Sequence, residues 1–227
     1  MPRVMLAALL IVAAPAAAQE TLNVVVTIGE AVVQRPPDRA FVTIASEVRA
    51  KTSREAQRLD AEAMAAVQQR LAQLAIAKDA IRTLGVDLQQ EFDFPQGRRV
   101  PREYVARNTI EVRVDDLAHV GDVLDAAVQA GATATSGVRF DLRDRSGAER
   151  EALRLAVADA RARADAAASG AGRGIDRIVK VEDTRESAII MPRAMMGGVA
   201  RAEAAQTPVQ AGTIEIRARV TLTAAMK

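Results

Sequence analysis

The 227-residue sequence contains no cysteine and no tryptophan, and only one histidine, one tyrosine and four phenylalanines. Without cysteine the chain can form no disulfide and carry out no thiol chemistry, so its stability has to come from packing of aliphatic side chains. Binding of nucleic acid calls for a basic stripe with stacking aromatic residues. Aromatic residues are scarce here, and 31 basic residues are balanced by 29 acidic ones. We therefore expect no nucleic-acid partner.

Long apolar runs are also missing, except at the N-terminus. Arg3 precedes an apolar stretch from Val4 to Ala14, and Ala16-Ala17-Ala18 matches the small-x-small pattern of a cleavage site. The stretch is short for a spanning helix and no basic cluster follows it, which disfavours the alternative of a membrane anchor. No cysteine follows the cleavage point, which excludes a lipoprotein anchor. We predict a signal peptide over 1–18 and a periplasmic mature domain over 19–227 without a transmembrane span.

Alternation of apolar and polar residues predicts the strands of the mature chain. The alternation is clearest in Thr213–Thr223, and the polar turn PQGRRVP predicts a hairpin between the third and fourth strands. The predicted strands are Leu22–Val33, Ala40–Arg49, Ile81–Phe94, Tyr104–Val114, Val138–Leu142, Ile175–Asp183 and Thr213–Thr223.

Three amphipathic helices are predicted between these strands. Capping boxes begin the first and third helices, and a glycine ends the second. The boundary residues are Thr52 with Glu55 for the first helix, Asp115-Asp116 and Gly131 for the second, and Ser146 with Glu149 and Ser169 for the third. The expected inner faces are Leu59, Ala63, Val67, Leu71 and Leu74, then Leu117, Val120, Leu124, Ala127 and Val128, then Leu153, Val157, Ala160 and Ala164.

The order of elements indicates the fold class. From Ala40 to Leu142 it is β-α-β-β-α-β, the ferredoxin-like pattern, and an α-β-β unit follows. We predict an α+β fold with an antiparallel-rich sheet and helices packed on one face. Two arrangements of the last unit stay open. It extends the same sheet, or it forms a second lobe, with lobes at about 19–142 and 143–227.

His119 is the single histidine, and helical spacing places Asp115, Asp116 and Asp122 near it. One alternative is a metal site of one imidazole and these carboxylates. Acidic residues are favoured at a helix N-terminus without any metal, so we prefer an exposed histidine on a capped helix. A Ser-His-Asp triad would need the same histidine, and no G-x-S-x-G elbow is present. We predict no catalytic residue.

Two further motifs resemble binding sites. The glycines of Gly170–Gly174 follow a helix and precede a strand, whereas a dinucleotide loop follows a strand and opens a helix. They therefore predict a helix end and a turn. Met191, Met195 and Met196 lie in the long segment before the last strand. Thioethers bind Cu(I) or act as an oxidisable sink, but adaptable apolar contact is the interpretation we prefer. We predict no cofactor and no metal ligand.

Several segments occur in an order that is fairly specific: GEAVVQRPPDRAFVTIASEV, KDAIRTLGVDLQQEFDF, YVARNTIEVRVDDLAHVGDVLDAAVQAGA, GVRFDLRD, ADARARADAAASGAG and PVQAGTIEIRARVTLT. On these segments the chain resembles the SIMPL-domain family of exported bacterial proteins, over about Leu22–Thr223. The family often has Gln-Thr-Ser-Gly where this chain has Arg82–Gly85, and Gly-Ala-Asn where it has Gly131–Thr133. Both differences leave the resemblance intact.

The resemblance implies a periplasmic or envelope-associated protein. Members of the family are described as immunogenic periplasmic proteins and as oxidative-stress defence proteins, and one type assembles into a large ring. No catalytic residues are established for the family. We expect a non-enzymatic envelope protein that acts through self-assembly or partner binding, in envelope or oxidative stress defence. The alternative is a periplasmic hydrolase or metal-dependent enzyme whose site forms only on folding.

We expect the self-assembly to be a homo-oligomer formed through the terminal strand Thr213–Thr223 and the apolar segment before it. A strand at a sheet edge is a ready template for pairing with another chain, and we expect this strand to lie at an edge.

Export generates the first testable prediction. Because an apolar stretch and an Ala-x-Ala site are both present, we expect cleavage after Ala18 and Gln19 as the first mature residue. N-terminal sequencing of the protein from the envelope fraction measures this. An intact Met1 on a membrane-bound product would contradict the prediction.

Overall fold

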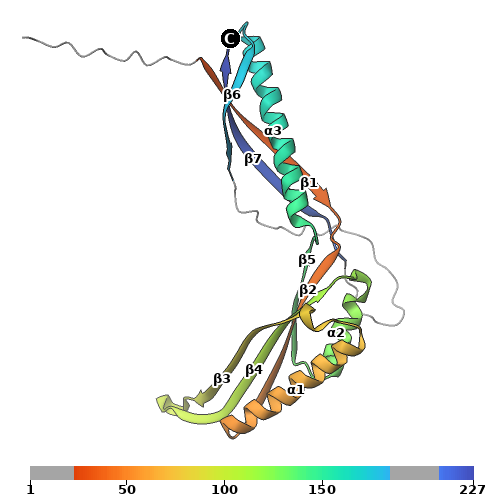
Figure 1. Cartoon of the computed structure of the whole chain (residues 1–227). Helices are drawn as coiled ribbons and strands as arrows, with labels where there is room; N and C mark the ends of the chain where they lie inside the picture. Colours follow the sequence, from red (N-terminus) through yellow and green to blue (C-terminus); the bar gives the residue numbers. More distant parts are fainter. Residues whose placement is uncertain (1–22, 185–209) are drawn as a thin grey trace, which may run out of the picture.

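The computed structural model describes residues 23–184 and 210–227, in which seven strands and three α-helices follow the predicted order (Figure 1). The long segment with Met191, Met195 and Met196 lies outside the described residues. The elements are β1 (Val24–Arg35), β2 (Arg39–Ala50), α1 (Ser53–Gln73), β3 (Ile81–Asp93), β4 (Val100–Val114), α2 (Val120–Gln129), β5 (Ala134–Asp141), α3 (Arg145–Gly170), β6 (Ile175–Asp183) and β7 (Ile214–Met226).

The predicted ferredoxin-like segment is confirmed as a four-stranded sheet of order β3-β4-β2-β5, with every neighbouring pair antiparallel. Helices α1 and α2 cover one face of this sheet. The strands contribute the alternating residues that the sequence pattern selects, and the helices close the core over them. The fully buried members of this core include Val42, Ile44, Ile110, Val112, Val67, Leu71, Val120 and Val123.

The last α-β-β unit does not extend that sheet. Strands β6 and β7 join β1 in a second, three-stranded sheet of order β1-β7-β6, and α3 covers one of its faces (Figure 1). Strand β7 therefore lies between β1 and β6 over Val220–Met226, and the expectation that the strand as a whole forms an edge is wrong. Alternating burial occurs in central and edge strands of a half-covered sheet alike, so the pattern could not separate the two.

The chain crosses between the sheets twice, at 36–38 and at 142–144, and the two crossings are bonded together. The backbone N–H of Asp38 donates to the carbonyl of Asp141 at 3.3 Å, and the N–H of Arg143 donates to the Asp38 carboxylate at 2.8 Å. Pro36 and Pro37 occupy the first crossing. Because proline fixes φ, this short connection is stiff. The predicted turn between the first two strands therefore carries the chain from one sheet to the other.

Helix α3 packs on β1 through a column of small residues. The buried positions of the helix are Ala148, Ala152, Ala156, Ala160, Ala164 and Ala168. Of the expected inner face, Ala160 and Ala164 are buried, whereas Leu153 and Val157 are half-buried at its margins. Strand β1 approaches so closely that the hydroxyl of Thr27 donates to the Ala160 carbonyl at 2.7 Å. The N-cap is Asp144, which accepts from the N–H of Gly147, and not the predicted Ser146.

The other two helices also differ in detail from the expected faces. In α1, Thr52 is the predicted N-cap and accepts from the N–H of Glu55 at 3.3 Å. The buried face of this helix contains Asp60 and Met64, one residue beyond the expected Leu59 and Ala63. In α2 the expected Val128 is exposed.

The shift in α1 has a polar cause. The hydroxyl of Ser46 on β2 donates to the carboxylate of Asp60, and both residues are buried. This contact holds the acidic residue under the sheet. Ser46 also lies opposite Asn108 of β4 in the register. A buried acid has no place in an apolar pattern, so the sequence periodicity missed it.

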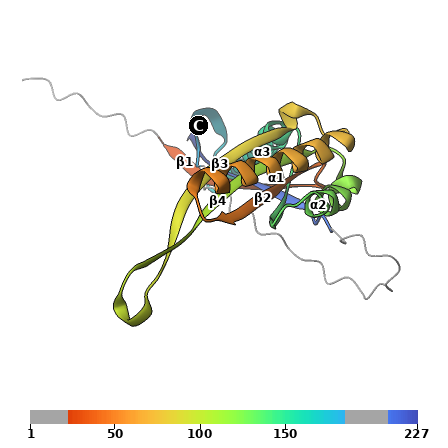
Figure 2. The same ribbon diagram turned by 90° about the horizontal axis from the view of Figure 1, so that it is seen from below.

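Strands β3 and β4 form the predicted hairpin, whose far end projects away from the helices (Figure 2). Strand β3 is an edge of its sheet along its whole length of 13 residues.

The close approach of α3 to β1 generates a stability prediction. A Cβ atom added at Gly29 would overlap the backbone carbonyl of Ala156 and the backbone nitrogen of Ala160. Backbone atoms cannot rotate away, so we expect Gly29→Val to lower the free energy of unfolding by about 3 kcal/mol or more. Urea denaturation followed by circular dichroism measures this.

Gly85→Val is the matched control, because a Cβ at Gly85 would meet nothing within 4 Å. Both substitutions replace a strand glycine with the same residue, so their difference isolates the contact with α3. Equal stability of the two variants would contradict the close packing.

Candidate functional site

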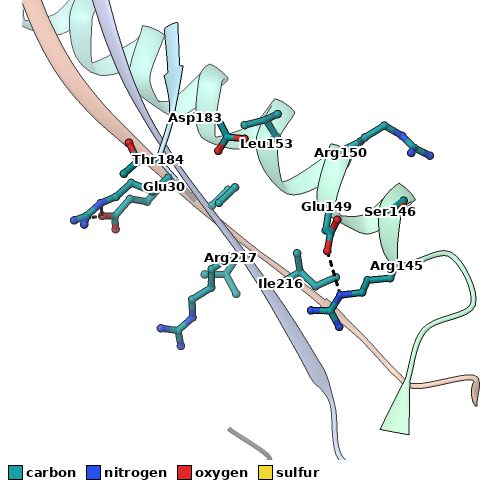
Figure 3. Close-up of a pocket in the computed structure, with 14 residues that line it drawn as sticks. Glu30, Arg145, Ser146, Glu149, Arg150, Leu153, Asp183, Thr184, Ile216 and Arg217 are labelled. Atoms are coloured by element: carbon teal, nitrogen blue, oxygen red, sulfur yellow. Dashed lines mark hydrogen bonds and ion pairs between the residues drawn. The ribbon is translucent and has the colours of Figure 1, made fainter. Parts of the chain in front are cut away.

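A groove lies beside β7, at the point where its pairing with β6 ends. The register of β6 stops at Asp183 opposite Val220, and the N–H of Thr184 still donates to the Arg219 carbonyl at 3.0 Å. Within the described chain, Ile214–Ala218 pair with no strand on that side. The groove encloses about 730 Å³ and runs between this free edge and the first turns of α3 (Figure 3). Its residues come from all four elements of the three-stranded unit.

The walls of the groove are charged and its floor is apolar. On α3, the Arg145 guanidinium lies 3.1 Å from the Glu149 carboxylate and 3.3 Å from Asp141. The sheet contributes Ile216 and Ala218, which point toward the helix because alternate residues of a strand share a face. This arrangement is suited to an extended chain, whose backbone would bond to the β7 edge.

The arginines of β7 that line the groove both lie in ion pairs. Arg219 lies 2.8 Å from Glu30, and Arg217 lies 3.0 Å from Glu215. The hydroxyl groups that line the groove belong to Ser146 and Thr184. The single histidine of the chain lies on the helix layer of the other sheet. No general base of the histidine type is therefore brought to these hydroxyls.

His119 is placed as an exposed side chain at the start of α2. Its side chain is 63% exposed, and its Nδ1 lies 3.1 Å from the Asp116 carboxylate. Asp116 also caps the turn by accepting from the N–H of Ala118. Asp115 bonds to arginines instead. Within 23–184 and 210–227, the structure gathers no group of three or more residues able to hold a metal ion.

The glycines after α3 form a helix end and a turn, as predicted. Gly172 has φ of +71°, a conformation that favours glycine, and its N–H donates to the carbonyl of Ser169 at 2.9 Å. The N–H of Arg173 donates to the Ala168 carbonyl, also at 2.9 Å. The backbone groups of this segment are thus used to end the helix and not to cradle a phosphate.

A cluster of arginines surrounds Asp115 near the crossing between the sheets, and the sequence patterns gave no sign of it. Arg39 lies 2.6 Å from the Asp115 carboxylate and Arg113 lies 3.2 Å from it. Arg143 donates to the Asp115 backbone carbonyl and, at 3.2 Å, to that of Asp38. Partial burial raises the pKa of the Asp115 carboxyl. The hydrogen bond from Arg39 and the charges of the surrounding arginines together lower this pKa by more than burial raises it. The net pKa lies below its usual value.

Residues 25–224 match the family model described as "SIMPL: Protein of unknown function (DUF541)". The chain belongs to the SIMPL family. The match begins in β1 and ends in β7, so the SIMPL unit includes both sheets and the crossings between them. The predicted family resemblance is therefore confirmed over the span on which it was made.

Three similar proteins share 28% to 29% sequence identity with this chain. The chain is 29% identical to the 26 kDa periplasmic immunogenic protein of Brucella abortus over 169 residues, which cover 72% of this chain and 68% of the relative. It is 28% identical to the protein of the same name from Brucella melitensis. It is also 28% identical to the uncharacterized protein YggE of Escherichia coli K12, over 59% of this chain and 54% of that protein.

The arginine cluster of this SIMPL protein generates a pH prediction. The pKa of Asp115 is lower in the folded protein than in the unfolded chain, where it is about 3.9. The ion pairs of Asp115 therefore stabilise the fold at pH values above about 3.9. This stabilisation is lost as the pH falls through the lower pKa of the folded protein. We expect Asp115→Asn to be less stable than the wild type at pH 7 by about 1 kcal/mol, since the pair is partly exposed.

The difference between the two proteins should shrink as the pH falls below about 4. Urea denaturation of both proteins from pH 7 to pH 3 measures it. A difference that stays constant over this range would contradict a charged role for Asp115.

Proposed function

We propose that this SIMPL protein is a non-enzymatic protein of the periplasm that acts in the cell envelope through self-assembly or by binding a partner protein. The proposal includes removal of residues 1–18 on export, and those residues lie outside the described chain. The observation that carries it is the outer edge of β3.

Strand β3 combines a free edge with exposed apolar side chains. Leu84, Val86 and Leu88 are 49%, 63% and 40% exposed. The backbone groups on the outer side of β3 bond to no described strand. Edge strands that are long and apolar pair readily with another chain, and natural proteins usually protect them with charged residues or cover them. The middle of β3 has Asp87 as its single charged residue between Arg82 and Glu91.

The other edges of the two sheets each carry some protection, although β1 and β6 also expose apolar side chains, among them Val26 at 58% and Val179 at 47%. At β1 the carboxylate of Asp159 on α3 accepts from the outward N–H of Glu30 at 3.0 Å, which blocks the centre of that edge. Strand β5 has eight residues and a mostly polar sequence. Strand β6 is exposed but carries ion pairs along its length, including Lys180 with Glu182 at 2.7 Å. We choose β3 as the assembly edge because it is the longest of the four edge strands and has one charged residue in its middle.

The periplasmic part of the proposal rests on the relatives and on the leader. Two of the similar proteins are named as periplasmic. Among the described residues, no helix has the length and apolar character needed to cross a membrane. A role in envelope or oxidative stress defence rests on the family resemblance alone.

The non-enzymatic part is supported by how the groove beside β7 uses its charges. Arg145, Glu149, Arg217 and Arg219 each lie in an ion pair that the fold itself supplies. The arrangement of this groove favours contact with a chain over chemistry on a small molecule.

The assembly proposal is tested by the mass of the mature protein. We expect a species larger than the monomer at micromolar concentration in light scattering. Val86→Lys with Leu88→Lys should reduce the mass to that of the monomer, because charges on an edge oppose strand pairing. A strictly monomeric wild type would contradict self-assembly.

The matched control is Val128→Lys with Leu155→Lys, which places the same charges at exposed apolar positions on α2 and α3. This variant should keep the wild-type mass. Circular dichroism verifies that both variants are folded. Loss of assembly in both pairs would show a general effect of charge and remove the support for the β3 edge.

A further inference from the structure

The end of the β3–β4 hairpin, residues 92–102, forms a narrow projection that we call the hairpin tip (Figure 2). Its turn is formed by Pro95–Gly97, in which Gln96 and Gly97 have φ of +53° and +79°. The last strand pair before the turn is Asp93 opposite Val100. The hairpin tip is therefore a short, well-defined turn with side chains on both of its strands.

The hairpin tip exposes an aromatic ring at its apex. Phe94 is 66% exposed, the largest value for any large hydrophobic side chain in the described chain. Val100 is 41% exposed and follows on the returning strand. In a sequence with four phenylalanines and one tyrosine, an aromatic ring placed in solvent calls for an explanation. Phe94 and Val100 together place apolar surface at the end of the hairpin.

Arginines follow this ring closely in the sequence. Between 93 and 102 the sequence has three arginines and one aspartate. Arg102 lies 3.4 Å from that aspartate, Asp93. The guanidinium of Arg99 lies 3.6 Å from the centre of the Phe92 ring. Arg98 has no ion pair within the described part of the chain.

Two further acids, Glu91 and Glu103, flank the hairpin tip, and neither forms an ion pair with Arg98 or Arg99 within the described residues. Glu91 is held by Arg49 of β2 at 3.1 Å, on the side toward the body of the sheet. Two guanidinium groups of the hairpin tip, those of Arg98 and Arg99, are therefore left without a carboxylate partner. A surface with this charge is complementary to an anion.

We propose that the hairpin tip binds an anionic phospholipid surface. The arginines would contact lipid phosphates, for which the planar guanidinium is well shaped, and Phe94 would enter the boundary between headgroups and acyl chains. A stable protein contact buries about 800 Å² on each partner, more than one turn offers, whereas a lipid surface accepts a few side chains. The proposal goes beyond the assembly function and does not depend on it.

Phe94→Trp tests insertion directly, because the protein has no other tryptophan. With the mature full-length chain, we expect the emission to shift to shorter wavelength on adding vesicles of phosphatidylglycerol and phosphatidylcholine. Vesicles of phosphatidylcholine alone should give a smaller shift or none. Val128→Trp, another exposed position, is the control and should not shift. Equal shifts at both positions, or no shift at residue 94, would overturn the proposal.

Flotation with the same vesicles tests the charges. Arg98→Gln with Arg99→Gln should weaken binding by about thirtyfold, since each arginine near an anionic surface contributes roughly fivefold. Arg154→Gln with Arg161→Gln removes the same charge from the exposed side of α3 and should leave binding unchanged. Binding of the wild type should also weaken as the salt concentration rises.

Equal binding by the two double variants would overturn the proposal. A separate outcome would assign the tip to a protein contact. In that case the variant with both Arg98→Gln and Arg99→Gln would form a smaller assembly than the wild type in light scattering without vesicles. The assembly proposal is tested by the β3 edge variant alone. A monomeric protein that binds the vesicles, or an oligomer that does not, therefore separates the two ideas.

Discussion

Residues near the two ends of the described chain pair along the whole length of β1, from Val24 opposite Ala225 to Arg35 opposite Ile214. The three-stranded sheet depends on this antiparallel pairing, because β1 contacts no other strand. Everything between the two strands, including the entire ferredoxin-like unit, lies inside the loop that the pairing closes. Closing a long loop costs entropy that grows slowly with length, so the cost has to be met by an extensive contact. Twelve consecutive residue pairs and a packed helix provide that contact.

Helix α3 makes the pairing of β1 and β7 a packed layer. Its buried face is alanine throughout, and the small side chains allow β1 to approach the helix backbone at Gly29. Larger side chains on either surface would separate the layers and lose the hydrogen bond from Thr27 to the Ala160 carbonyl. The polar contacts of α3 with β1 then protect the β1 edge, since Asp159 occupies the N–H of Glu30. One helix thus supplies both the packing and the edge protection of this sheet.

Local patterns in the sequence predicted the elements well and their partners less well. Alternation located β6 and β7, and a glycine located the end of α2, because these signals act within a few residues. The same alternation could not show that β7 is central, since the position of β1 beside it is set by residues about 190 positions away. The burial of Asp60 under Ser46 escaped detection because hydrophobic periodicity assigns an acid to the surface. The cluster around Asp115 escaped for a related reason: its arginines come from three separate segments.

The sequence contains the residues of the proposed functional surfaces but does not show that these residues lie together on a surface. Leu84, Val86 and Leu88 are ordinary strand residues until the sheet order places β3 at an edge. Residues 92–102 are ordinary turn residues until the pairing of β3 with β4 places them at the end of a hairpin. The groove beside β7 depends on where β6 stops pairing, which is a property of the register. Each candidate site therefore arises from tertiary arrangement, and composition could indicate only which chemistries to exclude.

The side and the end of the β3–β4 hairpin are linked by geometry. If two identical β3 edges paired antiparallel across a two-fold axis, their hairpins would run in opposite directions and their tips would face opposite sides. If β3 instead paired with a different edge of its neighbour, the contact would be heterologous and could close into a ring. In a ring all tips are related by rotation about one axis and face the same side. Several weak tips on one side would bind one membrane with much higher avidity than a single tip. A two-fold dimer would instead bridge two vesicles. Clustering of vesicles by the wild-type protein would therefore indicate the two-fold arrangement. Tight binding without clustering would indicate the ring.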